Sequence, residues 1–297
     1  MKLLLTGANG LIGKHLANNL YLKGNNIIGL GRSELDPTFT SFPYYQMDLA
    51  INPSLYDETI QSNIDVVIHC ASQQPSHGSS CFDFYNSNIL ATSNLLSWME
   101  SRGIKKLVYF STLALLKFSK KDNNALDEKA TLFPDNAYTI SKASVEQILS
   151  VYSMKNQMSV YCLRIPSVVH PNQKGGIVDT YYKKAINGED LEVYDMGEMK
   201  RNLINVYSIS DIVEKIILEI NGSFNLFNIG SSDSWRQLDI ARYFYEKFSR
   251  LSKISAVTTN SKVSGNWMIN TSKAEKYLNF KPWSIQEILD KYCDDLS

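Results

Sequence analysis

The sequence predicts an α/β fold: a doubly wound parallel sheet of the Rossmann type with a smaller C-terminal α/β substrate-binding lobe. Short apolar runs alternate with amphipathic stretches in the first half of the chain, and a glycine-rich turn joins the first run to the first helical pattern. We expect the Rossmann domain over residues 1–165 and the lobe over 166–297, with one segment near 203–230 returning to the sheet.

The N-terminal residues are expected to form the first two strands of this sheet and the helix between them. The apolar runs 2–5 and 27–30 predict two strands, and between them apolar residues recur at every fourth position, at Ile12, Leu16 and Leu20. A strand, a helix and a second strand within about thirty residues make a βαβ unit, whose crossover connection sets the two strands parallel.

The same alternation continues along the chain. Apolar runs at 65–69, 106–111 and 159–164 predict further strands, and the patterns at 84–102 and 138–153 predict helices between them. This order is typical of a doubly wound sheet.

The regular pattern is interrupted twice. Residues 117–136 are polar and are expected to form a surface loop. After about residue 170 glycines break up the alternation, which indicates a separate lobe, although 224–229 reads as one more strand of the main sheet.

The turn after the first strand carries the first functional signal, in Thr6-Gly7-Ala8-Asn9-Gly10-Leu11-Ile12-Gly13. Gly7 allows a tight turn, Gly10 lets the backbone approach a pyrophosphate, and Gly13 lets the helix pack close to the strand. Phosphates would bind the free N–H groups at the start of that helix. The turn therefore predicts a dinucleotide site, and a plain strand-to-helix turn is the alternative.

The end of the second strand indicates which dinucleotide binds. A carboxylate there would bind the ribose 2′-hydroxyl of NAD, but the chain continues as Gly31-Arg32-Ser33. The guanidinium of Arg32 suits the 2′-phosphate of NADP, and the Ser33 hydroxyl can add a hydrogen bond. In the alternative, Arg32 is solvated, Glu34 or Asp36 reaches the ribose, and the cofactor is NAD.

A tyrosine and a lysine at helical spacing carry the second signal. Tyr138 and Lys142 lie four residues apart, on one face of the predicted helix. The lysine would lower the pKa of the phenol and help it to act as a general acid or base. Ser111 and Thr112 end a buried strand, where such sheets bind ligands, and Thr112 could hydrogen-bond the reacting oxygen. Alone, the Tyr–Lys pair could also be an exposed helix pair.

Composition excludes several partners. Thirty basic residues balance thirty acidic ones, so we expect no nucleic acid or membrane surface as partner. The four cysteines have no metal or redox spacing, and Cys70 and Cys162 are expected to be small core residues. No apolar run approaches the length of a membrane span, and the N-terminus starts directly with the first strand, so we expect a cytoplasmic protein. We also expect no bound metal.

Taken together, these motifs resemble the extended short-chain dehydrogenase/reductases, the group of nucleotide-sugar epimerases, dehydratases and reductases. The glycine turn, Tyr109-Phe110-Ser111-Thr112 and Tyr138-Thr139-Ile140-Ser141-Lys142 match the family's motifs in order. Asp48-Leu49 is similar to the acidic pair that contacts adenine, and Arg201 resembles the arginine that binds the sugar-nucleotide phosphates.

The resemblance implies roles for individual residues. The catalytic residues would be Thr112, Tyr138 and Lys142. The substrate would contact Gln73, Thr112, Ser167 and Arg201. The cofactor would contact Gly7, Asn9, Gly10, Leu11, Ile12, Arg32, Ser33, Asp48, Leu49, Cys70, Ala71, Ser72, Asn88, Ser111, Tyr138, Lys142 and Ile165. It also implies a homodimer through the helices near 84–102 and 138–153.

Departures from the family pattern narrow the reaction. Family dehydratases carry an Asp-Glu pair directly after the catalytic threonine, where this chain has Leu113 and Ala114, which cannot move protons. Ser167 replaces an asparagine frequent in epimerases, and His170, in place of a glycine, is expected to be a half-exposed loop residue. We therefore expect an NADPH-dependent reductase of a nucleotide-activated 4-keto(-6-deoxy) sugar. The alternatives are a nucleotide-hexose 4-epimerase with bound NAD and a non-catalytic NAD(P)-sensing binding protein.

Overall fold

The computed structural model describes residues 1–34, 42–51, 56–57, 60, 63–75, 79–118, 124–219, 223–248, 253–258 and 265–297. These residues form two compact units, each built from several chain segments. The first contains Met1–Leu115, Leu132–Ile165 and Ile209–Phe227, and the second contains Leu116–Thr131, Pro166–Ser208 and Asn228–Ser297. Asp36 and residues 119–123 of the expected surface loop lie outside the described residues.

The first unit is built on a seven-stranded sheet in the order β11-β6-β5-β4-β1-β2-β3. The registers from β6 to β3 are all parallel, and the order reverses beside β1, where β2 and β4 flank it. Sheets of this kind bind ligands beyond the strand ends at that point. The predicted fold class is confirmed. The strands are β1 (Lys2–Thr6), β2 (Asn26–Gly31), β3 (Tyr44–Gln46), β4 (Val66–His69), β5 (Lys106–Thr112), β6 (Ser159–Ile165) and β11 (Phe224–Asn228).

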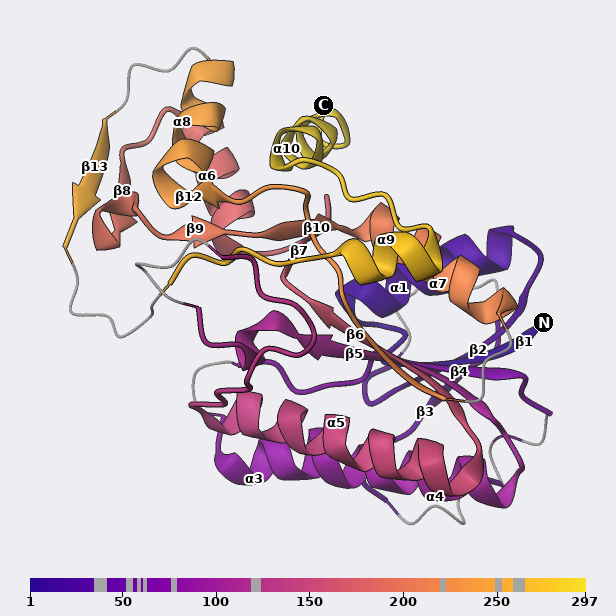
Figure 1. Ribbon diagram of the computed structural model, residues 1–297. Coiled ribbons are helices and arrows are strands. Elements are labelled where there is room, and N and C mark those ends of the chain that lie inside the picture. Colours follow the sequence, from indigo (N-terminus) through magenta and orange to yellow (C-terminus); the bar gives the residue numbers. More distant parts are fainter. Residues whose placement is uncertain are drawn as a thin grey trace. The chain divides into compact units, whose positions relative to one another are not determined.

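Helices cover both faces of this sheet (Figure 1). The helices α1 (Leu11–Leu22) and α7 (Val206–Leu218) lie on one face, where Lys23 pairs with Glu214. The other face packs against α4 (Ala91–Ser101) and α5 (Ala137–Asn156), and it buries Trp98, Met99, Val145 and Leu149 between the layers. This buried layer anchors α5, which carries the predicted tyrosine and lysine.

The helix expected over 84–102 is observed, but a π-helical segment interrupts its regular α-helical geometry. The helix consists of α3 (Cys81–Phe84), the π-helical segment η1 (Tyr85–Leu90) and α4. Ser80 starts α3 with a capping box, in which its hydroxyl accepts from the Asp83 N–H. Within η1 the Asn88 carbonyl accepts a hydrogen bond from the Thr92 hydroxyl at 2.6 Å, a bond that competes with the helical ladder.

The second unit packs helices around short strand pairs. Its core lies between α6 (Gly176–Asn187), α8 (Gln237–Lys247) and α10 (Ile285–Asp294), with the Tyr182 ring edge-on to Phe244 and Tyr292. The strand pairs are β7 (Ser167–Val169) with β10 (Leu203–Asn205), β8 (Leu191–Tyr194) with β13 (Ile254–Val257), and β9 (Lys200–Arg201) with β12 (Trp235–Arg236). The helix α9 (Ser272–Leu278) and the turns η2 (Leu113–Leu115) and η3 (Asp195–Gly197) complete the described elements.

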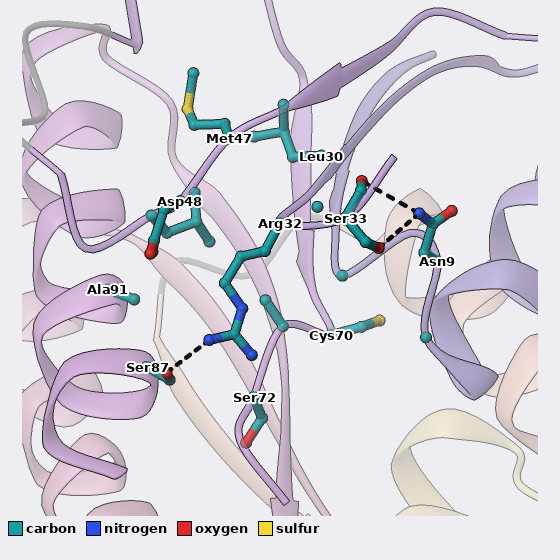
Figure 2. Close-up of a pocket in the computed structure, with 15 residues that line it drawn as sticks. Asn9, Leu30, Arg32, Ser33, Met47, Asp48, Cys70, Ser72, Ser87 and Ala91 are labelled. Atoms are coloured by element: carbon teal, nitrogen blue, oxygen red, sulfur yellow. Dashed lines mark hydrogen bonds between the residues drawn. The ribbon is translucent and has the colours of Figure 1, made fainter. Parts of the chain in front are cut away.

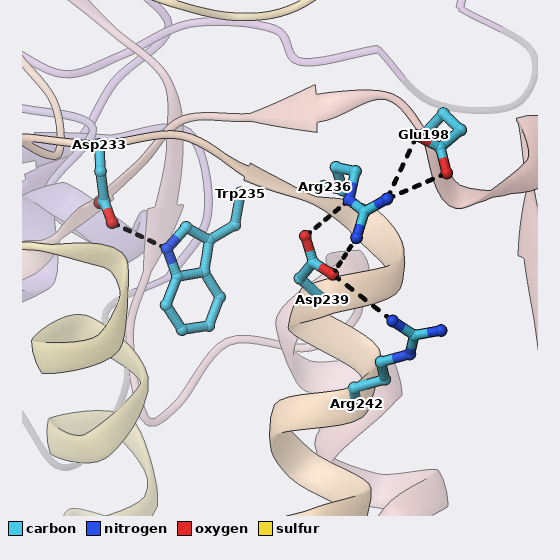
Figure 3. Close-up of polar contacts among 6 residues, drawn as sticks. All are labelled: Glu198, Asp233, Trp235, Arg236, Asp239 and Arg242. Atoms are coloured by element: carbon cyan, nitrogen blue, oxygen red, sulfur yellow. Dashed lines mark hydrogen bonds and ion pairs between the residues drawn. The ribbon is translucent and has the colours of Figure 1, made fainter.

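An ion-pair network fixes the start of α8 in this unit. Figure 3 shows the Arg236 guanidinium between Asp239 and Glu198. It donates two hydrogen bonds of 2.8 Å to the Asp239 carboxylate and one of 3.2 Å to Glu198. Asp239 lies in the first turn, where the helix dipole also favours a negative charge. Among the described residues, no helix is both long and apolar enough to cross a bilayer.

Candidate active site

Steric contacts explain why the turn between β1 and α1 carries glycines. Gly7 has φ +67°, and a Cβ there would lie 2.6 Å from the backbone nitrogen of Ala71. A Cβ at Gly13 would lie 2.1 Å from the Gly7 carbonyl oxygen. The turn therefore tolerates only glycine at both positions, and α1 starts directly beside β4.

The start of α1 provides unpaired backbone donors. Gly10 is the N-cap residue in extended conformation, with no side chain to accept from the first turn. Its own N–H donates to the Gly7 carbonyl at 2.9 Å. The N–H groups of Leu11 and Ile12 come next, and they have no acceptor within the helix because no helical turn precedes them. Such N–H groups can bind an anion.

A pocket of about 350 Å³ in the first unit opens above this turn (Figure 2). It brings together ten of the predicted cofactor residues from four separate segments. They are Gly7, Asn9, Gly10, Arg32, Ser33, Asp48, Leu49, Cys70, Ala71 and Ser72, and Leu30, Gly31, Met47, Ser87 and Ala91 complete the lining. Cys70, expected in the core, is half-buried at this pocket. Leu11 and Ile12 are not among the lining side chains.

Arg32 extends from the end of β2 across this pocket (Figure 2). Its guanidinium donates to the Ser87 hydroxyl at 3.1 Å and to the Gln73 amide oxygen at 3.3 Å. The side-chain amide of Asn9 donates to the Ser33 hydroxyl at 3.1 Å and to the Glu34 carbonyl oxygen at 2.6 Å, which fixes the backbone after β2. The acidic side chain among the lining residues is that of Asp48, which lies beyond the end of β3.

Thr112 and Tyr138 meet in the first unit, at the end of β5 and the start of α5. An Asn136 capping box with Thr139 starts α5 and places Tyr138 in its first turn. The Tyr138 phenol forms hydrogen bonds with Thr112 and with Gln74, a residue that the sequence did not single out. Burial raises the pKa of Tyr138, and these two hydrogen bonds partly offset that rise.

Lys142 lies one turn further along α5. It was expected to act on the Tyr138 phenol, but its hydrogen-bond partner is a backbone carbonyl. Its ammonium donates to the Phe110 carbonyl at 2.8 Å and lies 4.8 Å from the centre of the Tyr109 ring. The expectation that Lys142 lowers the Tyr138 pKa is therefore wrong here, since burial dominates and raises that pKa. Burial also lowers the pKa of Lys142 to about 8.

Three further predicted cofactor residues are not among those that line the pocket. The buried Asn88 amide accepts from the Gln73 N–H at 2.7 Å and donates to the Ser141 hydroxyl at 2.8 Å, so it ties the loop after β4 to α5. The Ser111 hydroxyl donates to a Glu146 carboxylate oxygen at 2.6 Å. Ile165 is buried at the end of β6.

The second unit contains its own cavity, of about 960 Å³. Arg201 lines it from β9, and with the Gln237 amide oriented to satisfy its hydrogen bonds, the amide oxygen accepts from Arg201 Nη2 at 2.6 Å and Nε at 2.7 Å. Burial lowers the pKa of Arg201, and the nearby Tyr181 and Asp195 partly offset this by raising it. The cavity lining also contains Gly176, Ile177, Thr180, Tyr181, Lys184, Asp190, Leu191, Glu192, Tyr194, Asp195, Met199, Lys253 and Ser255.

Two other predicted positions of this unit lie elsewhere. Ser167 is exposed on β7 and is not among the residues that line the cavity. His170, expected to be half-exposed, is buried, because its ring folds back on its own turn and accepts from the Asn172 N–H at 2.9 Å.

The parallel sheet, the glycine turn and the Thr112–Tyr138 pair define a protein of the extended short-chain dehydrogenase/reductase class. The chain belongs to the NAD-dependent epimerase/dehydratase family, whose model matches residues 3–230. The family resemblance found in the sequence is thereby confirmed.

Individual relatives are distant. A dTDP-D-glucose 4,6-dehydratase of Dictyostelium discoideum is 27% identical over 81% of this chain, which spans only 61% of that enzyme's length. A dTDP-4-dehydro-6-deoxy-D-allose reductase of a Streptomyces species is 22% identical over 97% of this chain and 94% of its own length. The crystal structure of UDP-glucose 4-epimerase from Thermotoga maritima matches with a TM-score of 0.88 over 99% of both chains, at 19% identity.

Proposed function

We propose that the protein is a reductase that converts a nucleotide-activated 4-keto(-6-deoxy) sugar into the 4-hydroxy sugar with NADPH. The observation that carries this proposal is the hydrogen-bonded Thr112–Tyr138 pair followed by Leu113, which is fully buried. A buried leucine can neither donate nor accept a proton, so the site offers one proton-transfer group and no second acid or base at that position. Reduction of a ketone requires one hydride and one proton.

The residues divide this reaction between them. When bound, NADPH supplies the hydride. Tyr138 gives its proton to the carbonyl oxygen of the sugar, and the Thr112 hydroxyl forms a hydrogen bond with the same oxygen. Lys142 contributes a positive charge beneath the site, anchored on the Phe110 carbonyl. Arg201 provides a cation for the phosphates of the sugar nucleotide.

The pocket above the glycine turn fits a dinucleotide. Gly7 and Gly13 let the turn pack closely against Ala71 and against the first turn of α1. The first N–H groups of α1 suit a pyrophosphate. Arg32 and Ser33 at the end of β2 favour the 2′-phosphate of NADP over the ribose hydroxyls of NAD.

Incubation with NADPH and a panel of nucleotide 4-keto-6-deoxyhexoses tests the proposal. We expect loss of NADPH absorbance with at least one sugar, and formation of the matching 4-hydroxy product. Interconversion of a nucleotide hexose without added reductant, by protein that purifies with tightly bound NAD, would refute it.

A nucleotide-hexose 4-epimerase with bound NAD is the second candidate. The family is described as NAD-dependent, and Arg32 is held by Ser87 and Gln73 instead of pointing freely from the strand end. A catalytically inactive NAD(P)-sensing protein is the third candidate, but it gives no reason for the Thr112–Tyr138 pair.

We further propose a homodimer formed through α5. Three apolar side chains on α5 are exposed, at Ile140, Val151 and Met154. Their spacing of 11 and then 3 residues places them on one face of the helix. A second copy of the same face would cover them.

A further inference from the structure

A buried ion pair lies behind the Thr112–Tyr138 pair in the first unit. The side chains of Glu146 and Arg164 are each only 3% exposed. Arg164 Nη2 donates to Glu146 Oε2 at 2.7 Å, and Arg164 Nε donates to Oε1 at 2.9 Å. This two-pronged contact is the strongest geometry available to an arginine and a carboxylate.

The pair joins three elements at the level of the predicted catalytic residues. Glu146 lies on α5 one turn after Lys142, and Arg164 is the last residue but one of β6. Glu146 Oε1 also accepts from the hydroxyl of Ser111, which directly precedes Thr112 and pairs with Arg164 in the sheet register. The carboxylate therefore ties α5 to the ends of β5 and β6.

The acidic groups that act on the charge of Lys142 are Cys162, Cys70 and Glu146. Burial raises the pKa values of the Cys162 and Cys70 thiols and of the Tyr109 phenol, so all three are neutral at pH 7. Burial lowers the pKa of His69 to about 3, so its ring is neutral as well. Glu146 is then the anion that opposes the lowering of the Lys142 pKa.

We propose that Glu146 and Arg164 are positioning residues for the proposed reaction, in which the pair holds α5 in register on β5 and β6 and adds no net charge beside Lys142. Neither residue lines the cofactor pocket, so both act through Lys142 and Thr112. This inference rests on the proposed function for its effect on turnover, but its effect on Lys142 is independent of any substrate.

Two variants that break the same pair test the proposal through opposite signs. E146Q removes an anion and keeps the Arg164 charge, so the pKa of Lys142 should fall by about one unit. R164Q leaves an unpaired Glu146 anion, so that pKa should rise by about one unit. A role limited to stability would weaken folding in both variants without moving the lysine in opposite directions.

The measurement is NMR titration of lysine labelled with carbon-13 at Cε, with Lys142→Met assigning the signal. If a single variant fails to fold, the double variant E146Q/R164Q leaves no buried charge unpaired, and its Lys142 should titrate near the wild-type midpoint. Shifts of the same sign in E146Q and R164Q, or no shift, would overturn the proposal.

Turnover provides the second readout. In E146Q/R164Q we expect kcat to fall roughly 10- to 100-fold, because α5 loses its tie to the strands, with an unchanged KM for NADPH. Wild-type kcat in the double variant would overturn the positioning role. If wild-type protein reduces no sugar while the lysine shifts as expected, the proposed function fails and the charge coupling stands.

Discussion

At Tyr138, burial and hydrogen bonding act on the phenol in opposite directions. Burial raises its pKa, and Thr112 and Gln74 partly offset the rise. A raised pKa keeps the phenol protonated through neutral pH, so it is ready to donate a proton, and this capacity is lost only as the pH rises through that pKa in the alkaline range. Reduction should therefore hold its rate through neutral pH and decline on the alkaline side.

Tyr138→Phe removes the proton donor and keeps the ring against Phe84, whose centre lies 6.0 Å away. We expect kcat to fall about 10²- to 10⁴-fold, the usual contribution of a general acid, with unchanged affinity for NADPH. Steady-state kinetics and fluorescence titration of NADPH measure the two quantities. Unchanged turnover in this variant would show that the phenol is not the proton donor.

Arg32 decides between the two dinucleotides. Arg32→Ala removes a charged hydrogen-bond donor worth about 1.5–3 kcal/mol, so NADPH should bind roughly 10- to 100-fold more weakly while NADH changes little. Ser87→Ala is the matched control: it frees the guanidinium from its 3.1 Å bond and should leave NADPH affinity equal or stronger. Equal losses for both cofactors in Arg32→Ala would refute NADP selection.

At the scale of elements, the turn between β1 and α1 has a matched control within the chain. Gly7 and Gly103 both have φ +67°, but a Cβ at Gly103 would meet nothing within 4 Å. Alanine at either site costs roughly 1–2 kcal/mol for the left-handed backbone.

Gly7→Ala adds a clash with Ala71 and should also abolish NADPH binding, measured by calorimetry. Gly103→Ala should lose thermal stability alone. Cofactor binding by Gly7→Ala at wild-type strength would show that the turn does not cradle the dinucleotide.

Sequence periodicity predicted the elements whose packing is local. The strand expected at 106–111 is observed as β5 (Lys106–Thr112), because each of its residues is buried. Periodicity failed where distant side chains decide the backbone or the partner. The π-helical turn around Asn88 and the Lys142–Phe110 bond depend on contacts made only after folding. Gln74 and Ser87 were missed because neither belongs to a motif.

At the scale of the molecule, the compact units do not follow the order of the chain. Residues 116–131 follow β5 in sequence but belong to the second unit, where the Leu126 N–H donates to the Met268 carbonyl at 2.9 Å. Residues 209–227 return to the first unit and supply most of β11. A polar loop has no periodicity from which such a contact could be predicted, whereas the apolar run at 224–229 marked the returning strand.

The exposed face of α5 has a consequence for assembly. Met154 is 73% exposed and Val151 is 49% exposed, and both lie on the same face as Ile140.

If a second copy covers this face, Val151→Asp with Met154→Asp should yield a monomer in sedimentation velocity, because a charge buried in an apolar interface is costly to desolvate. Leu22→Asp is the matched control: Leu22 is 76% exposed at the end of α1, on the other face of the sheet, and its replacement should leave the assembly unchanged. Both variants should keep NADPH binding, since none of these residues lines the pocket. Wild-type protein that sediments as a monomer would rule out the dimer and leave the apolar face of α5 without a partner.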